Sequence, residues 1–126
     1  MKQNFLICPH CGKIVATVKG SACPTVCCGK EMVALIPGAV DASKEKHVPI
    51  VRQEGNLVNV HVGEVLHPMT PEHSIEWISV ETLYGNQRHE LSPGDAPTAT
   101  FALTEGDELK AVYAYCNLHG LWMTKF

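Results

Sequence analysis

The sequence lacks three features that would each indicate a class of protein. No apolar run approaches the ~20 residues needed to cross a bilayer, so we expect no membrane partner. The N-terminus reaches Cys8 before any long apolar stretch, so a signal peptide is not expected either. The net charge is −3, without the basic excess of nucleic-acid-binding proteins, and we therefore expect no nucleic-acid partner.

Long stretches with a 3.6-residue hydrophobic period are also missing, as are internal repeats and low-complexity segments. Residues 57–62 alternate instead, with valine at every second position, and residues 75–80 and 111–115 are further strand candidates. Turn-forming residues separate such segments, as in 92–95 and 105–107. Short strands at these intervals favour an antiparallel sandwich or barrel, so an all-β fold is predicted.

Cysteine is the residue that divides the chain. The 126 residues hold six cysteines, five of them within 8–28 and the sixth at Cys116. We therefore predict a small unit over 1–36 and a larger one over 37–126. The small unit cannot bury much apolar surface, so a bound metal would serve as its core. Cysteines in a chain without a leader indicate metal or redox chemistry in a reducing cytosol, and a cytoplasmic protein is predicted.

The N-terminal cysteines have the spacing of a metal site. In Cys8-Pro9-His10-Cys11-Gly12, two thiolates converge on one ion, and the glycine permits a tight turn. Cys27 and Cys28 are adjacent and bind the same ion only from a bent segment, which Gly29 helps to form. Four thiolates suit either iron or zinc, and the spacing does not choose between them.

Cys23 is a spare thiol in this region. It could replace Cys27 or Cys28 as a ligand, but we favour a free cysteine beside the site. The alternative to a redox centre here is a structural zinc ribbon.

A second donor set lies further along the chain. It comprises one thiol and four imidazoles: His47, His67, His73, Cys116 and His119. So many nitrogens with one sulfur do not suit structural zinc and do suit a redox iron with one strong thiolate donor. Five protein ligands leave one open position on an octahedral metal, where ferrous iron could bind and reduce a small oxygen species.

The other three histidines are interpreted as residues without a metal. A lone histidine is usually a surface or hydrogen-bonded residue, and this applies to His10, His61 and His89. His10 lies inside the cysteine knuckle, His61 lies on the polar face of the alternating segment, and His89 lies in a polar stretch.

Together these motifs resemble the desulfoferrodoxin family, the two-iron form of superoxide reductase. The N-terminal cysteines are similar to a desulforedoxin-type module. Four further segments resemble the catalytic domain in the same order: residues 45–49, 67–69, 73–78 and 116–122. The resemblance covers nearly the whole chain.

The resemblance implies a desulforedoxin/rubredoxin-like metal-binding domain over 1–36, followed by an immunoglobulin-like β-sandwich over 37–126. It also implies two irons per chain. Cys8, Cys11, Cys27 and Cys28 would hold the first, with zinc as a substitute. The second would have four equatorial imidazoles and Cys116 as axial ligand. The implied reaction is reduction of superoxide to hydrogen peroxide, with a rubredoxin-like electron donor and a homodimeric assembly.

Two charged residues receive roles from the same resemblance. Glu45 would correspond to the glutamate that can occupy the sixth position of the oxidised iron, and Lys46 to the lysine that attracts superoxide. The alternative for both is a solvated side chain in a charged loop. The sequence departs from the family pattern at Ser74, where a larger residue is common, and at Cys23.

Three other functions compete with a reductase. An electron carrier would gain nothing from an open coordination position, and a zinc-binding interaction module would leave the histidines without a role. A superoxide dismutase would also have to oxidise superoxide, which a strong thiolate donor and a closing carboxylate disfavour.

Overall fold

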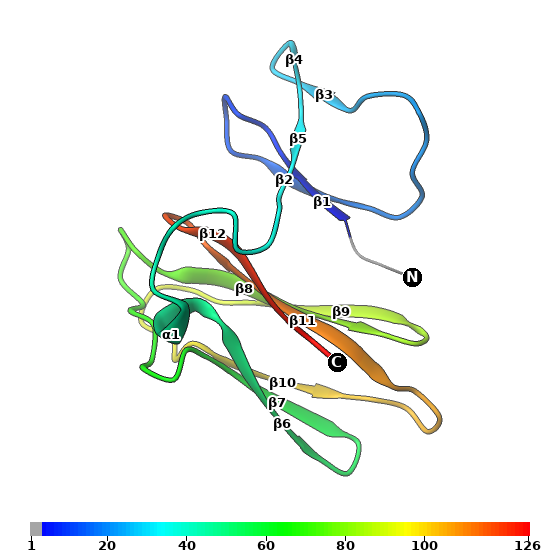
Figure 1. Cartoon of the computed structure of the whole chain (residues 1–126), viewed down its shortest axis with the longest axis vertical. Coiled ribbons are helices and arrows are strands. Elements are labelled where there is room, and N and C mark those ends of the chain that lie inside the picture. Colours follow the sequence, from blue (N-terminus) through cyan, green and yellow to red (C-terminus); the bar gives the residue numbers. More distant parts are fainter. Residues whose placement is uncertain (1–3) are drawn as a thin grey trace. The chain divides into compact units, whose positions relative to one another are not determined.

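The computed structural model describes residues 4–126, and its strands confirm the predicted all-β fold (Figure 1). The chain divides into two compact units, one ending at Ile36 and the other running from Pro37 to Phe126. Within the described residues the only helix is α1 (Lys44–His47), and no helix is long and apolar enough to span a bilayer.

The N-terminal unit consists of short strands. A three-stranded antiparallel sheet has the order β2-β1-β5, and a two-stranded hairpin pairs β3 with β4. The strands are β1 (Asn4–Ile7), β2 (Ile14–Thr17), β3 (Val26–Cys27), β4 (Lys30–Glu31) and β5 (Val33–Ala34). Its buried apolar residues in the described part are Phe5, Cys8 and Met32. So small a core needs another source of stability, such as a metal.

The C-terminal unit is a sandwich of two antiparallel sheets, which Figure 1 shows face to face with α1 at one end. One sheet has the order β10-β7-β6 and the other β12-β11-β8-β9. The strands are β6 (Pro49–Glu54), β7 (Leu57–Val62), β8 (Ile75–Thr82), β9 (Gly85–Glu90), β10 (Thr98–Ala102), β11 (Leu109–Cys116) and β12 (Gly120–Lys125).

The core between these sheets follows the alternation seen in the sequence. The valines of β7 at positions 58, 60 and 62 are buried, and they pack in one apolar cluster with Val112, Ala114 and Cys116 of β11. Successive strand residues point to opposite faces, so Cys116 is the last core-facing position of β11. The cysteine predicted to be a metal ligand is thereby placed inside the end of the sandwich.

A β-bulge aligns the partner strand with this ligand. Tyr115 pairs with Trp77 but Cys116 pairs with Ile75, so Glu76 has no residue opposite it. Such a bulge changes which side of the strand faces the core. Ile75 is consequently fully buried, and the segment just before β8 lies beside Cys116.

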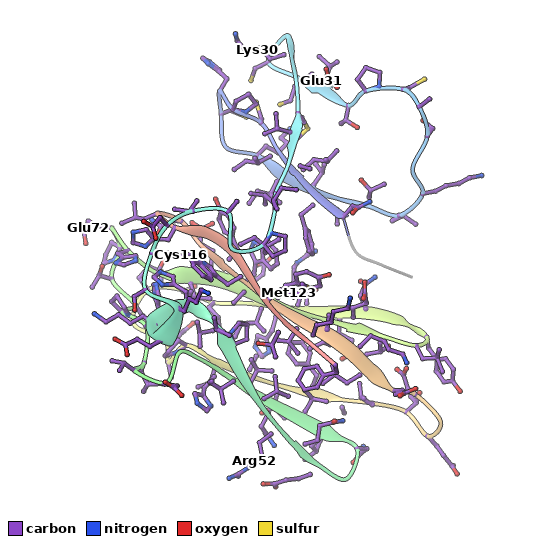
Figure 2. All side chains as sticks on the ribbon, viewed as in Figure 1. Lys30, Glu31, Arg52, Glu72, Cys116 and Met123 are labelled. Carbon is purple, nitrogen blue, oxygen red and sulfur yellow. The ribbon has the colours of Figure 1, made fainter. Side chains whose placement is uncertain are left out.

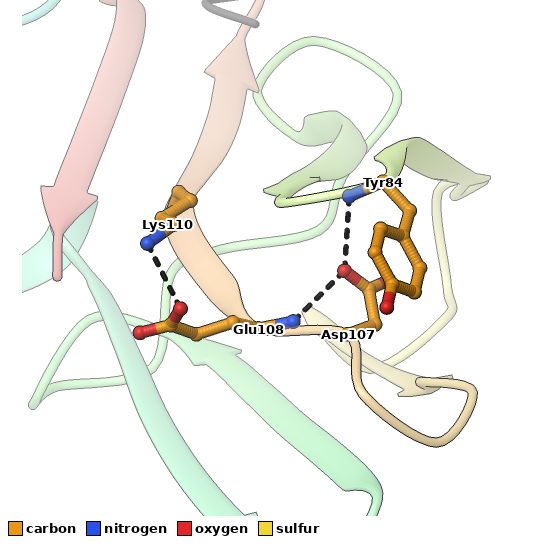
Figure 3. Close-up of polar contacts among 4 residues, drawn as sticks. All are labelled: Tyr84, Asp107, Glu108 and Lys110. Carbon is orange, nitrogen blue, oxygen red and sulfur yellow. Dashed lines mark hydrogen bonds and ion pairs between the residues drawn. The ribbon is translucent and has the colours of Figure 1, made fainter.

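The other end of the sandwich is closed by a polar corner (Figure 3). The Asp107 carboxylate accepts hydrogen bonds from the backbone N–H groups of Tyr84, at 3.0 Å, and Glu108, at 2.8 Å. Desolvation raises the pKa of Asp107, but hydrogen bonds from the Thr82 side chain and from the backbone of Glu108, Tyr84 and Leu83 outweigh it and hold the pKa below its usual value. Lys110 forms an ion pair with Glu108 at 3.0 Å, but the Glu108 side chain is exposed and the Lys110 side chain is only half-buried.

We expect Asp107→Ala to lower the Tm by several degrees, because two backbone donors lose a charged acceptor. Glu108→Gln removes only the exposed ion pair and should change the Tm little. Thermal unfolding of the two variants beside the parent protein tests this. Equal Tm values for Asp107→Ala and the parent protein would show that the corner does not stabilise the fold.

Candidate metal centres

Three segments bring the second donor set together at one end of the C-terminal unit. His47 ends α1, His67 and His73 lie in the connection from β7 to β8, and Cys116 and His119 flank the turn between β11 and β12. Figure 2 shows Cys116 at the α1 end of the sandwich, with Glu72 of the β7–β8 connection at the same end.

The four imidazoles form a closed square. In the order 47, 67, 73, 119, neighbouring ring centroids are 4.7, 4.6, 5.1 and 4.8 Å apart, with the last distance closing the ring. Each neighbouring pair is edge-to-face, whereas His47 and His73 are 6.3 Å apart across the square. Four side chains from three segments therefore surround one point.

The ring nitrogens that face this point carry lone pairs. Nδ1 of His47 lies 2.6 Å from the Ser43 carbonyl and Nδ1 of His67 lies 2.7 Å from the Pro68 carbonyl, so in each ring Nδ1 donates. A neutral imidazole has one proton, so both Nε2 atoms are acceptors, although they lie only 3.2 Å apart. Nε2 of His73 is buried with no hydrogen-bond partner among the described residues. A cation between these atoms would satisfy all of them.

The spacing of the donors indicates the geometry of the ion that fits. Nε2 of His47 lies 3.2 Å from Nε2 of His67 and 3.1 Å from Nδ1 of His119. Two nitrogens ~2.1 Å from one ion lie ~3.0 Å apart at right angles and ~3.4 Å apart in a tetrahedron. The His47–His119 distance is nearer to the right-angle value, and the His47–His67 distance lies midway between the two values. With one thiolate in the set, the residues fit a redox iron better than a structural zinc.

Cys116 supplies the sulfur of this centre. Its side chain is fully buried, and Sγ lies 3.8 Å from Nδ1 of His119 and within 4.8 Å of the donors of His47, His67 and His73. Burial raises the pKa of the Cys116 thiol, against two backbone N–H groups, of Leu118 and His119, that lower it. A metal that binds here displaces a proton, and the same N–H groups then hydrogen-bond the thiolate.

Three of the histidines, His47, His67 and His73, are held in the neutral form that binds metals. Desolvation lowers the pKa of His67 from 6.5 to about 4. Desolvation also lowers the pKa of His47 and of His73, and the positive charge of Lys46 adds to both effects. Neutral imidazoles bind metals, so no protons have to leave these rings near neutral pH.

We expect the metal-free protein to lose stability as the pH falls from about 7 to about 5. The folded-state pKa values of His47, His67 and His73 lie below 6.5, so the unfolded chain takes up protons first, and stability declines until the pH passes the folded value, about 4 for His67. Denaturation midpoints measured across this range test the expectation.

His67→Gln is the matched variant for this pH series, and it should flatten the decline in stability. Carboxylates titrate mainly below the upper part of this range, so they do not mask the effect there. A midpoint that stays constant from about pH 7 to about pH 5 would contradict the desolvation of these rings.

The N-terminal unit gathers the four predicted thiols, Cys8, Cys11, Cys27 and Cys28, within 4.8 Å of one another. Sγ of Cys27 lies 3.7 Å from that of Cys11 and 3.9 Å from that of Cys28. Thiolates ~2.3 Å from a tetrahedral ion lie ~3.8 Å apart, so the set fits zinc or iron. The bend that brings two adjacent cysteines together is left-handed at both Cys28, with φ 54°, and Gly29, with φ 70°.

The pKa values of these thiols differ. The N–H of Cys11 donates to Sγ of Cys8 at 3.4 Å and is the main reason that the pKa of Cys8 is lowered to about 6. Hydrogen bonding to Cys11 and Cys27 raises the pKa of Cys28 to about 12. The Cys8 thiolate is therefore stable without a metal, whereas a cation is needed to displace the proton of Cys28. Cys23 is exposed and lies outside the group.

The two charged residues predicted beside the second centre lie in α1. Lys46 is exposed, and its charge acts on both His47 and His73. Glu45 is also exposed and lines a surface hollow with Val48 and Glu64. Its carboxylate is not part of the described metal-ligating group.

Several residues that support the centre carried no signal in the sequence. The carbonyls that orient His47 and His67 are backbone atoms, which any residue could supply. Trp122 stacks near His47, with centroids 5.0 Å apart, and donates its indole N–H to the His119 carbonyl at 3.0 Å. Gly63 is a further support, because a Cβ there would clash with the Val65 carbonyl and with the backbone of α1.

A β-sandwich with an N4S donor set, joined to a small unit with an S4 set, defines a metalloprotein with two distinct centres. The desulfoferrodoxin family model matches residues 39–125, and the chain belongs to this family. Its resemblance to that family is thereby confirmed.

Two relatives match nearly the whole chain, and a third matches about two thirds of it. The sequence is 48% identical to a desulfoferrodoxin of Syntrophotalea carbinolica, over 98% of this chain and 97% of the relative. The crystal structure of the superoxide reductase from Treponema pallidum matches with a TM-score of 0.84 and 39% identity, covering 99% of this chain and 100% of that one. A one-iron superoxide reductase from Giardia intestinalis matches with a TM-score of 0.56 and 35% identity, covering 66% of this chain and 98% of its own.

Proposed function

We propose that this protein is a superoxide reductase, an oxidoreductase that converts superoxide to hydrogen peroxide. The observation that carries the proposal is the square of four imidazoles with one buried cysteine sulfur beside it. Superoxide gains one electron and two protons and leaves as hydrogen peroxide. When bound by this donor set, ferrous iron supplies the electron and becomes ferric.

The ligands of that iron are His47, His67, His73, His119 and Cys116. The Ser43 and Pro68 carbonyls fix two of the imidazoles in the tautomer that presents Nε2. The N–H groups of Leu118 and His119 hydrogen-bond the Cys116 sulfur and moderate the charge that it donates. Five protein ligands leave one position for a small substrate.

Lys46 attracts the substrate. Superoxide is a small anion, and an ammonium group whose field reaches two of the four imidazoles raises its concentration at this face. Glu45 is proposed as the carboxylate that can occupy the open position of the oxidised iron. Its exposed place in a four-residue helix gives its side chain freedom to turn toward the centre.

The N-terminal thiols are proposed to hold a second iron, with zinc as the alternative occupant. Cys8, Cys11, Cys27 and Cys28 are its ligands. The proposed electron donor is a small rubredoxin-like protein. The proposed assembly is a homodimer, and the proposed role is removal of superoxide in the cytoplasm. Six free thiols support that reducing compartment.

A non-catalytic electron carrier is the alternative function, and the donor set argues against it. A carrier needs no substrate position, and four thiolates would serve it as well as the mixed set. A zinc-binding module would likewise make no use of a square donor arrangement.

The test is to mix the anaerobically reduced, iron-loaded protein with superoxide and to follow its loss by stopped-flow absorbance. We expect removal much faster than spontaneous dismutation, with oxidation of the histidine-bound iron. Protein loaded only with zinc is the control and should show no acceleration. Equal rates of superoxide loss with the iron-loaded and the zinc-loaded protein would reject the proposed function.

A further inference from the structure

One amide side chain links the two segments that carry His73 and Cys116. Oδ1 of Asn117 accepts the N–H of Ser74 at 3.0 Å, and Nδ2 of Asn117 donates to the Glu72 carbonyl at 2.9 Å. The N–H of Asn117 also donates to the Ser74 carbonyl at 3.2 Å. The Glu72 carbonyl belongs to the peptide group before His73, and the Ser74 N–H belongs to the peptide group after it. The two side-chain bonds therefore fix both peptide planes that flank His73, and with them the direction of its Cα–Cβ bond.

His73 depends on this support more than His47 and His67 do. Those rings are oriented by hydrogen bonds from Nδ1 to backbone carbonyls. Among the described residues, no comparable bond holds the His73 ring, and its Nε2 is buried without a partner. Besides its edge-to-face contacts with His67 and His119, the direction of this imidazole is therefore set by its backbone.

A second contact restrains the same backbone from the other side. Thr70 and His73 exchange hydrogen bonds between their backbone groups, at 2.9 and 3.2 Å, and the Thr70 hydroxyl adds two more contacts. This turn holds His73 within its own loop only. The Asn117 side chain ties the loop to the strand end that carries the sulfur donor, next to the strand pairing of Cys116 with Ile75.

The chemistry of the amide suits this task. Asparagine offers one acceptor and two donors on a short side chain, which matches a carbonyl and an N–H on successive peptides. Aspartate of the same shape would keep the acceptor but would place an oxygen against the Glu72 carbonyl. Alanine would keep neither contact.

We propose that Asn117 is a positioning residue that sets the direction of the His73 imidazole relative to Cys116. It thereby controls how tightly iron is held and the energy of the sulfur-to-iron charge transfer. The inference rests on the iron centre of the proposed function, but it concerns the geometry of that centre rather than its reaction.

The experiment compares Asn117→Ala and Asn117→Asp with Asn59→Ala in the iron-loaded full chain. Asn59 of β7 accepts a hydrogen bond from Thr100 of β10, a neighbouring strand in the same sheet, and serves as the control for loss of an amide. Removing a partner that orients a metal ligand typically weakens metal affinity ~10–100-fold, and we expect this loss of ferrous iron affinity in Asn117→Ala. Its ferric charge-transfer band should shift but persist, because Cys116 remains. The Ser74 amide should exchange hydrogen faster.

In iron affinity and ferric spectrum, Asn117→Asp should lie between the parent protein and Asn117→Ala, with the Ser74 amide still protected from hydrogen exchange. If Asn117→Ala does not fold, Asn117→Asp is the variant that tests the inference. Asn59→Ala should match the parent in affinity and spectrum. Parental iron affinity, spectrum and Ser74 exchange in the variants at position 117 would overturn the inference. So would a lower Tm with an unchanged iron spectrum and affinity, because it would show a role in stability only. Failure of the parent protein to remove superoxide would reject the proposed function and leave this comparison intact.

Discussion

Cys116→Ser is expected to abolish reduction of superoxide and to remove the sulfur-to-iron charge-transfer band of the ferric protein. The Cys116 sulfur is the sole sulfur in the second donor set, and it is fully buried. A serine hydroxyl in its place stays protonated and donates little charge. Loss of partners that only orient a ligand changes metal sites ~10–100-fold, so loss of this ligand should lower the rate ~100-fold or more.

Visible absorption of the oxidised protein and stopped-flow rates of the reduced protein measure these two effects. Cys23→Ser is the matched control, because Cys23 is exposed and lies outside both groups of donors. It should behave as the parent protein. If Cys116→Ser kept both the band and the turnover, the sulfur would have to come from elsewhere.

Lys46→Ala is expected to slow the second-order reaction with superoxide about three- to tenfold at low salt. It should also weaken the dependence of the rate on ionic strength, because screening acts on the attraction that the substitution removes. The basis is the field of Lys46, which acts on His47 and His73. Rates measured over a series of salt concentrations give both quantities.

Lys44→Ala provides the matched control, since Lys44 is an exposed lysine of the same helix and its charge is not among the causes that shift the two imidazoles. It should change the rate less than Lys46→Ala does. An unchanged rate and salt slope in Lys46→Ala would reject the steering role.

Glu45→Ala separates the proposed role of the neighbouring carboxylate from that of Lys46. Its ferric spectrum should change while the first reaction with superoxide stays near the parent rate. A ferric spectrum identical to that of the parent protein would show that Glu45 is not a ligand.

The strands and the core could be predicted because they follow from local patterns. Alternation over 57–62 corresponds to β7, and the segments 75–80 and 111–115 fall inside β8 and β11. Each pattern reflects burial of one face of a strand, which single residues report directly. The register that puts Ile75 opposite Cys116 could not be predicted from the sequence, because the bulge at Glu76 arises only when two strands pair.

The donor residues could likewise be predicted from residue type and spacing, whereas their orientation could not. Imidazole and thiol side chains are common metal ligands, so their spacing in the sequence indicates a metal site. The atoms that aim them are mostly backbone groups, such as the Ser43 and Pro68 carbonyls, and they have no signature in the sequence. Asn117 is adjacent to a predicted ligand, yet its contacts to Glu72 and Ser74 depend on the folded loop.

The most direct test of the account is the number of hydrogen peroxide molecules formed per superoxide consumed. Anaerobically reduced, iron-loaded protein should be used with catalase absent. We predict one peroxide per superoxide, with one equivalent of the histidine-bound iron oxidised. One peroxide per two superoxides, with oxygen evolved, would contradict this account and identify a dismutase.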